Sequence, residues 1–150
     1  MKLCELLDVA CVLPNMTSED KDEAVAELVD VLVRAGRISD RQGVIDAVMQ
    51  RESLQTTGIG SGVAVPHAKH GCVTKLTAAL GISRNGVEFD SVDDKPVHVV
   101  FLILARLNDP GPHVQALAEI ARLLQIPGFY RKLVAAKTAE ELLAAIADEE

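Results

Sequence analysis

Apolar and polar residues follow a helical period near the start of the chain. Thr17-Ser18-Glu19-Asp20 is typical of a capped helix start, and apolar residues recur at helical spacing from there until Gly36 ends the pattern. A second amphipathic segment begins at about Asp40 and predicts a short helix with Arg51 near its C-terminal end. Two helices are therefore expected before the glycine-rich stretch that follows.

The middle of the chain has the pattern of strands. Apolar and polar positions alternate from Leu76 to Ile82, which indicates a half-buried strand, and Asn85-Gly86 is a turn signal. The apolar run from Pro96 to Ala105 predicts a second, fully buried strand. The longest uncharged apolar run of the chain, Val97 to Ala105, is less than half of the roughly 20 residues that a membrane-spanning helix needs.

Three further helices are predicted after the strands. They cover residues 113 to about 125, 128 to about 136, and 138 to about 148, and Thr138 opens the last one with a capping box to Glu141. Helices on both sides of central strands predict a sheet covered on two faces, in one domain that spans residues 1–150. The inward face of the first of these helices is expected to comprise Val114, Leu117, Ala121 and Leu124.

Composition and charge indicate which kind of macromolecule the chain binds. The chain has 150 residues, 49% of them hydrophobic, which is enough for one substantial core. Its net charge is −7 and only four residues are aromatic, so it has neither a basic track nor a stacking platform for nucleic acid. An acidic surface instead favours encounter with a basic patch on a partner protein.

The sequence also bears on the compartment. Glu5 and Asp8 interrupt the apolar stretch at the N-terminus before any site like that of signal cleavage. The three cysteines, Cys4, Cys11 and Cys72, cannot all pair within the chain and fit a reducing environment. We therefore expect a cytoplasmic protein without membrane insertion.

One motif carries most of the chemical information. Glycines at alternate positions in 58–62 allow close backbone approach, and Pro66 restricts Val65 to an extended conformation ahead of His67. The backbone is thus expected to aim the His67 imidazole and to offer N–H donors to an anion. A histidine with a near-neutral pKa beside such donors suits acceptance of a phosphoryl group.

This motif resembles the active-site segment of the IIA proteins of the phosphoenolpyruvate-dependent phosphotransferase system, mannitol/fructose type, nearest the nitrogen-regulatory IIA. Members of that family carry an Arg-Glu pair followed by Thr-Gly-Ile-Gly-x-Gly-x-Ala-x-Pro-His, matched here by Arg51-Glu52 and residues 57–67. The similarity covers nearly the whole chain, with one departure at Ala68, where glycine is usual. It implies a three-layer α/β/α sandwich with a central mixed sheet, and phosphorylation of His67.

The resemblance also implies roles for three supporting residues, each of which has a plainer explanation. His113 would lie beside His67, although it equally suits the start of a helix after the loop 108–112. Arg51 would pair with the phosphoryl oxygens, although an arginine late in a helix also complements the helix dipole. Thr57 would donate its hydroxyl to the same oxygens, although threonine also suits turn geometry.

Other chemistries fit less well. His67, His70 and Cys72, completed by His113 or His98, form a conceivable zinc set, but their spacing matches no common zinc pattern. The glycines make neither a dinucleotide fingerprint nor a Walker loop. No cofactor, metal ion or nucleotide is therefore expected.

The prediction is a phosphoryl carrier rather than a stand-alone turnover enzyme. His67 would accept a phosphoryl group from an HPr-type phosphocarrier through a covalent phosphohistidine. We expect the nitrogen-regulatory version, in which phosphorylation alters protein binding, because no attached IIB, IIC or HPr-like segment is recognised. The alternatives are a sugar-uptake IIA that passes the group to a IIB cysteine, a non-phosphorylated binding module, and a zinc-binding protein.

Overall fold

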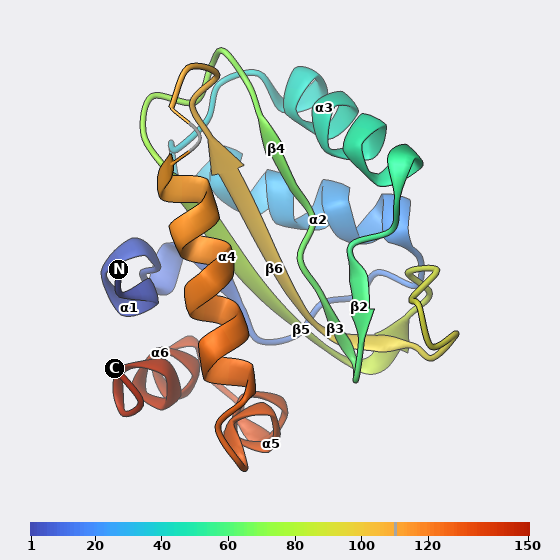
Figure 1. The fold of residues 1–150 in the computed structure, drawn as a ribbon, viewed down its shortest axis with the longest axis vertical. Helices are drawn as coiled ribbons and strands as arrows, with labels where there is room; N and C mark the ends of the chain where they lie inside the picture. Colours follow the sequence, from blue (N-terminus) through green and yellow to red (C-terminus); the bar gives the residue numbers. More distant parts are fainter. Residues whose placement is uncertain (110) are drawn as a thin grey trace.

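A mixed six-stranded sheet separates two layers of helices in the computed structural model, which describes residues 1–109 and 111–150 (Figure 1). The strands are β1 (Val12–Leu13), β2 (Gly58–Gly60), β3 (Val63–Ala64), β4 (His67–Lys69), β5 (Thr77–Val87) and β6 (Val97–Ala105). The predicted three-layer α/β/α sandwich with a central mixed sheet is confirmed.

The two long strands form the centre of the sheet. Its order is β1-β5-β6-β3-β2, and β4 pairs with β6 beyond the end of β3. β5 and β6 are antiparallel, whereas β3 and β4 run parallel to β6. Every residue of β6 except His98 is buried, because helices cover both faces of the strand. The predicted buried strand is confirmed.

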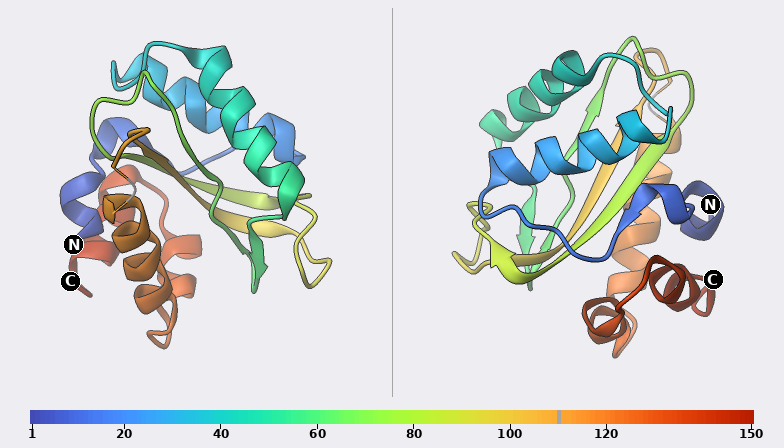
Figure 2. Two further views of the ribbon diagram at one scale, coloured as in Figure 1. Left: turned by 45° about the horizontal axis from the view of Figure 1, so that its top comes forward. Right: turned by 180° about the vertical axis from the view of Figure 1, so that it is seen from behind.

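One face of the sheet is covered by α2 (Lys21–Arg34) and α3 (Arg41–Leu54), which lie together above the strands in the left view of Figure 2. Asp20 caps α2 by accepting from Glu23 N, and Asp40 caps α3 by accepting from Gly43 N. Both predicted helices are thus confirmed, and Arg51 lies in the last turn of α3.

The opposite face carries the C-terminal helices. These are α4 (Gly111–Leu124), α5 (Phe129–Ala135) and α6 (Ala139–Ala147), joined by the short N-terminal α1 (Leu3–Leu6), while a 3₁₀ turn, η1 (Val9–Cys11), leads into β1 (Figure 2). All three predicted helices are confirmed, and Thr138 caps α6 as expected. α4 begins two residues before His113, so this histidine lies in its first turn. Pro110, in the loop predicted to precede His113, lies outside the described residues.

The details of β5 differ from the prediction. Residues 77–83 are buried on both faces rather than half-buried. Asn85-Gly86 is not a hairpin turn, because β5 continues through it with a register shift between Ile82 and Val87. Gly86 takes φ +89° there, and its amide donates to Ser83 Oγ at 3.0 Å. The dipeptide therefore forms an irregularity within the strand, and the chain reverses later, in residues 88–96.

The inward face of α4 also differs from the prediction. Its buried residues are Ala116, Ile120 and Leu123, whereas Val114 is 60% exposed. Both stripes of the helix are apolar, so the hydrophobic period alone did not distinguish them. Packing on β6 buries the stripe of Ala116, Ile120 and Leu123, whereas Leu117 and Leu124 are only partly buried against the core and Val114 and Ala121 are exposed.

No helix within residues 1–109 and 111–150 has the length and apolar character required to span a membrane.

Candidate functional site

His67 is the first residue of β4, and the backbone around it determines how its ring is used. Its Nδ1 lies 2.8 Å from the carbonyl oxygen of Val65. Because a carbonyl only accepts, Nδ1 carries the proton and Nε2 carries the lone pair. Val65 is itself held, since its amide donates to Thr57 O at 3.0 Å. The ring is thus oriented with its lone pair on Nε2.

Two adjoining cavities contain His67 and Arg51. The larger, about 430 Å³, lies between α3, β4 and the start of α4. It is lined by Ala47, Gln50, Arg51, Leu54, His67, Ala68, Lys69 and His113. The second, about 340 Å³, is lined by Arg51, Gln55, Thr56, Thr57, Ile59, Val65, His67, Leu117, Ile120 and Ala121. The fold therefore brings three predicted residues, His67, His113 and Arg51, to one cavity.

Burial affects the protonation of both histidines in this cavity. Removal from solvent lowers the pKa of His67, and the nearby Arg51 charge adds to this shift, whereas the hydrogen bond to Val65 and the charge of Glu52 oppose it. Burial also lowers the pKa of His113, with further effects of His67, Lys69 and Arg51. Both rings are consequently neutral near pH 7, and a neutral His67 retains the lone pair that a nucleophile requires.

The His113 ring makes no hydrogen bond to any of the residues that the structure describes. Its ring centroid lies 4.8 Å from that of His67, with the planes tilted by 39°. Both ring nitrogens are buried, and neither has a partner among the described residues. A buried polar atom without a partner is rare in folded proteins. This ring is therefore available to a group that enters the cavity.

Two cations also line the cavity. Arg51 donates from Nη1 to Gln55 O at 2.9 Å, which uses one of the five N–H groups of a guanidinium. Lys69 is two residues after His67 in β4, and alternate residues of a strand share a face. Sequence reasoning missed Lys69, although strand spacing from His67 was a signal for it.

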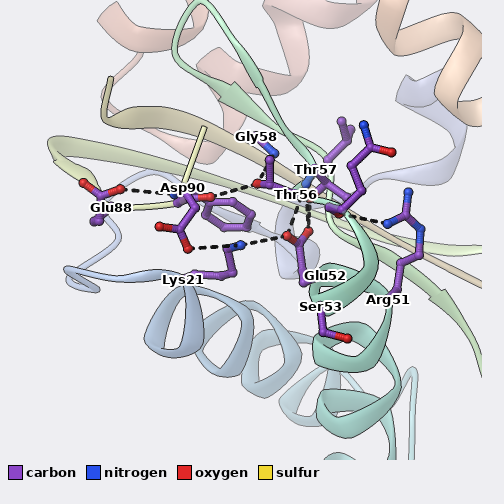
Figure 3. Close-up of polar contacts among 12 residues, drawn as sticks. Lys21, Arg51, Glu52, Ser53, Thr56, Thr57, Gly58, Glu88 and Asp90 are labelled. Carbon is purple, nitrogen blue, oxygen red and sulfur yellow. Dashed lines mark hydrogen bonds and ion pairs between the residues drawn. The ribbon is translucent and has the colours of Figure 1, made fainter. Parts of the chain in front are cut away.

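Thr57 is buried and has a different partner from the predicted one. Its hydroxyl donates to the carboxylate of Glu52, and its amide donates to the same carboxylate at 3.1 and 3.2 Å (Figure 3). Lys21 Nζ lies 3.1 Å from Glu52 Oε2 on the other side. The Thr57 hydroxyl proton is thus engaged within the chain, whereas the prediction directed it to phosphoryl oxygens.

The glycines shape a hairpin rather than an anion cradle. Gly60 and Gly62 take φ of +92° and +82° in the turn between β2 and β3. The amide of Ser61 donates to Asp93 Oδ2 at 3.0 Å, and that of Gly58 donates to Thr56 Oγ1 at 3.1 Å. The turn borders another cavity, with Tyr130, so the expected N–H donors do not surround the imidazole.

The alternative of a zinc site lacks a donor set in the described part of the chain. His70 Nε2 lies 3.5 Å from Asp40, and its Nδ1 accepts from the amide of Cys72 at 3.0 Å. His98 pairs through Nδ1 with Ser83 O at 2.8 Å. Within residues 1–109 and 111–150, no three His, Cys, Asp or Glu side chains are arranged to hold a metal ion.

The substitution of Ala68 for the usual glycine fits the structure. Ala68 is buried in β4 opposite Leu104, and it does not take a positive φ. Extended backbone accepts alanine without strain, so this position does not require glycine.

Known proteins resemble the chain over its whole length. The family model described as "Phosphoenolpyruvate-dependent sugar phosphotransferase system, EIIA 2" matches residues 5–149. A fructose-specific EIIA component of Haloferax volcanii is 37% identical over 85% of each chain. A nitrogen regulatory protein of Bradyrhizobium diazoefficiens is 32% identical over 98% of this chain and 95% of its own. A fructose-specific EIIABC component of Bacillus subtilis is 36% identical over 95% of this chain, which spans 22% of that protein.

Solved structures agree. The nitrogen regulatory protein IIA-Ntr of Neisseria meningitidis superposes with a TM-score of 0.88 at 30% identity, covering 96% of this chain and 98% of its own. The mannitol IIA of Escherichia coli has the same fold, with a TM-score of 0.79 at 24% identity, covering 93% and 98%. The chain belongs to the EIIA type 2 family of the phosphoenolpyruvate-dependent sugar phosphotransferase system, a family of phosphoryl carriers.

Proposed function

We propose that His67 accepts a phosphoryl group on Nε2 from the phosphohistidine of an HPr-type carrier protein. The observation that carries the proposal is the hydrogen bond from Nδ1 to Val65 O, which leaves the lone pair on Nε2. That lone pair forms the new N–P bond while the donor's N–P bond breaks and the donor imidazole keeps the bonding electrons. The Nδ1–H group keeps its hydrogen bond to Val65 O, and this hydrogen bond stabilises the positive charge that phosphorylation brings to the ring.

Charge stabilisation is assigned to the side chains that line the cavity. Arg51 offers further N–H groups to the phosphoryl oxygens, and Lys69 adds a second positive charge. His113, whose nitrogens have no partner among the described residues, donates to the same oxygens. Thr57 contributes through its hold on Glu52 in this arrangement, and direct donation would require its hydroxyl to leave that carboxylate.

The surface around the cavity suits a protein donor. Leu54 and Ile59 line the two cavities and are 79% and 51% exposed, and Val114 beside His113 is 60% exposed. Exposed apolar side chains gathered at one site are typical of surfaces that bind another protein. Net charge of −7 favours a donor with a basic face. We place this exchange in the cytoplasm.

Two uses of the phosphorylated form have support. The likeness to IIA-Ntr over 96% of this chain favours the nitrogen-regulatory use, in which phosphorylation changes which protein is bound. The fructose-specific relatives at 36% and 37% identity favour the second candidate, transfer onward to a IIB cysteine. Incubating the phosphorylated protein with a fructose-type IIB domain separates the two, because rapid loss of the phosphoryl group is expected only for the sugar-uptake function.

The first step is tested by incubation with phosphoenolpyruvate, enzyme I and an HPr-type carrier. Mass spectrometry should find one acid-labile, base-stable phosphoryl group on His67. His67→Ala should abolish labelling, whereas the control His98→Asn, at a strand position away from the cavity, should leave it intact. Labelling of His70, His98 or His113 instead, or no labelling with any cognate donor, would overturn the proposal.

A further inference from the structure

A buried carboxylate lies behind the candidate site. The side chain of Glu52 is 2% exposed and is contacted by donors from two segments, Lys21 of α2 and Thr57 (Figure 3). It accepts from the amide and the hydroxyl of Thr57, and Lys21 Nζ lies 3.1 Å from its Oε2. Asp90 shares the same ammonium at 3.5 Å, and the Phe89 ring packs against it. Glu52 is therefore neutralised and fully bonded within the fold.

The contacts of Glu52 continue to the imidazole. Thr57, held by Glu52 at its amide and hydroxyl, accepts from Val65 N at 3.0 Å through its carbonyl. Val65 in turn accepts the Nδ1–H of His67 at 2.8 Å through its own carbonyl. Each residue in this series is buried except His67, which is half-buried. A displacement of Thr57 is therefore transmitted to the acceptor that orients the ring.

We propose that Glu52, held in place by Lys21, is a positioning residue that selects the Nδ1–H tautomer of His67 through Thr57 and Val65. The proposal deepens the proposed function and rests on it, since it assigns the preparation of the nucleophile to a residue that does not line the His67 cavity. Glu52 selects the tautomer through the backbone and makes no contact with the phosphoryl group; its negative charge separately raises the pKa of the His67 ring.

The chemistry at this position requires a carboxylate. Four donor contacts converge on Glu52, and a carboxylate offers only acceptors to them. A glutamine of the same shape presents an NH₂ group, which opposes either the Thr57 amide or the Lys21 ammonium. The Thr57 segment then shifts, the Val65 carbonyl moves from Nδ1, and the ring gains access to the Nε2–H tautomer, which has no lone pair on Nε2.

The chain offers a matched control in Glu27. This carboxylate of α2 also accepts from two backbone amides and two hydroxyls, those of Thr17 and Ser18. It stabilises an N-terminal segment that has no part in the His67 cavity. Glu27→Gln therefore removes the same kind of interaction without affecting the series that ends at His67.

The experiment measures the tautomer and the rate in the full chain. Two-bond ¹H–¹⁵N spectra, recorded above the pKa of the ring, report which nitrogen of His67 carries the proton, and single-turnover transfer from phosphorylated HPr-type carrier reports the rate. Glu52→Gln should reduce the Nδ1–H population and slow acceptance roughly 10- to 100-fold, because small misplacement of a reacting group has effects of that size. Thr57→Val, which keeps the amide but removes the hydroxyl, should give a smaller change in the same direction.

Glu27→Gln should leave both readouts at wild-type values, and thermal melts establish that each variant is folded. The proposal is overturned if Glu52→Gln retains the wild-type tautomer, whatever its rate, or if Glu27→Gln changes both readouts equally. If Glu52→Gln does not fold, Thr57→Val decides by the same criteria. Absence of labelling in the wild type would contradict the proposed function, while the tautomer measurement would still decide this inference.

Discussion

The two sides of the His67 cavity differ in how their polar groups are partnered. On the α3 side, the Glu52 carboxylate and the backbone of Thr57 and Val65 are all hydrogen-bonded within the chain. On the α4 side, neither ring nitrogen of His113 has a partner among residues 1–109 and 111–150, and the neighbouring Val114 is 60% exposed.

This difference suggests that the two sides have different roles, one in orienting His67 and the other in binding the phosphoryl group. In the proposed function, groups that are satisfied internally hold His67 before the phosphoryl group arrives, which reduces the reorganisation required during transfer. Groups without internal partners carry a cost of burial that an incoming anion relieves. The α3 side is thus suited to orient His67, and the α4 side is suited to bind what His67 receives.

The largest expected effect tests the receiving groups. Arg51→Ala and His113→Ala should each slow acceptance by roughly 10- to 100-fold, because a charge-assisted hydrogen bond contributes about 1.5–3 kcal/mol. Single-turnover transfer from phosphorylated carrier measures the effect, and circular dichroism melts report folding. Wild-type rates in both folded variants would show that Arg51 and His113 take no part in transfer and serve only as residues at the ends of helices.

A change at the rim should affect binding more than chemistry. Leu54→Asp introduces a charge at a residue that is 79% exposed in the larger cavity, and it should raise the KM for the carrier about tenfold with little change in kcat. Val9→Asp is the control, since Val9 is 50% exposed in η1, away from the cavity. An equal rise in KM for both variants would argue against a contact at Leu54.

Acid should destabilise the protein through the two buried imidazoles. Their pKa values are lowered in the folded state, so the unfolded chain binds more protons once the pH falls below about 6.5. The free energy of unfolding should therefore be highest above pH 7 and decrease as the pH falls through the unfolded value toward the folded ones. Urea melts at pH 7.5, 6.5 and 5.5 should show a smaller decrease in His113→Gln, whereas an unchanged decrease would assign the acid sensitivity to other groups.

The smallest effect is expected away from both sides of the cavity. His70→Gln and Cys72→Ser should leave phosphoryl acceptance within about twofold of wild type, because transfer needs one nucleophile and His70 is paired with Asp40. Metal analysis of protein purified without added metal provides the second readout. Stoichiometric zinc that is lost in these variants would revive the metal-site alternative.

Local patterns predicted the long elements well. The helices capped by Asp20, Asp40 and Thr138 begin where side-chain acceptors precede apolar periodicity, and the cap acts within one turn of its residue. The continuous apolar run also predicted β6 correctly, since a strand that is buried on both faces requires apolar residues at successive positions. The short strands β1 to β4 were not predicted, because two or three residues are too few to show an alternation of apolar and polar positions.

The sequence predicted which residues belong to the candidate site, but not the hydrogen-bond partners of those residues. The motif around Pro66-His67 and the spacing of Arg51-Glu52 indicated phosphoryl chemistry, because those residue types and their backbone constraints are local properties. The partners of these residues were not accessible in this way. In the glycine-rich segment, the amides of Gly58 and Ser61 donate to side chains of the chain itself, and the Thr57 hydroxyl is bonded to Glu52.

Residue order was therefore sufficient for the capped helices and the central strand, and it singled out His67 as the candidate nucleophile, because all of these depend on interactions within a few positions of one another. Tertiary structure decided which stripe of α4 is buried, that Lys69 joins the cavity, and that His113 remains without an internal partner among the described residues. These features depend on contacts between segments distant in the chain. A hydrogen bond or a packed face is chosen there by competition among all neighbours, and local sequence does not specify those neighbours.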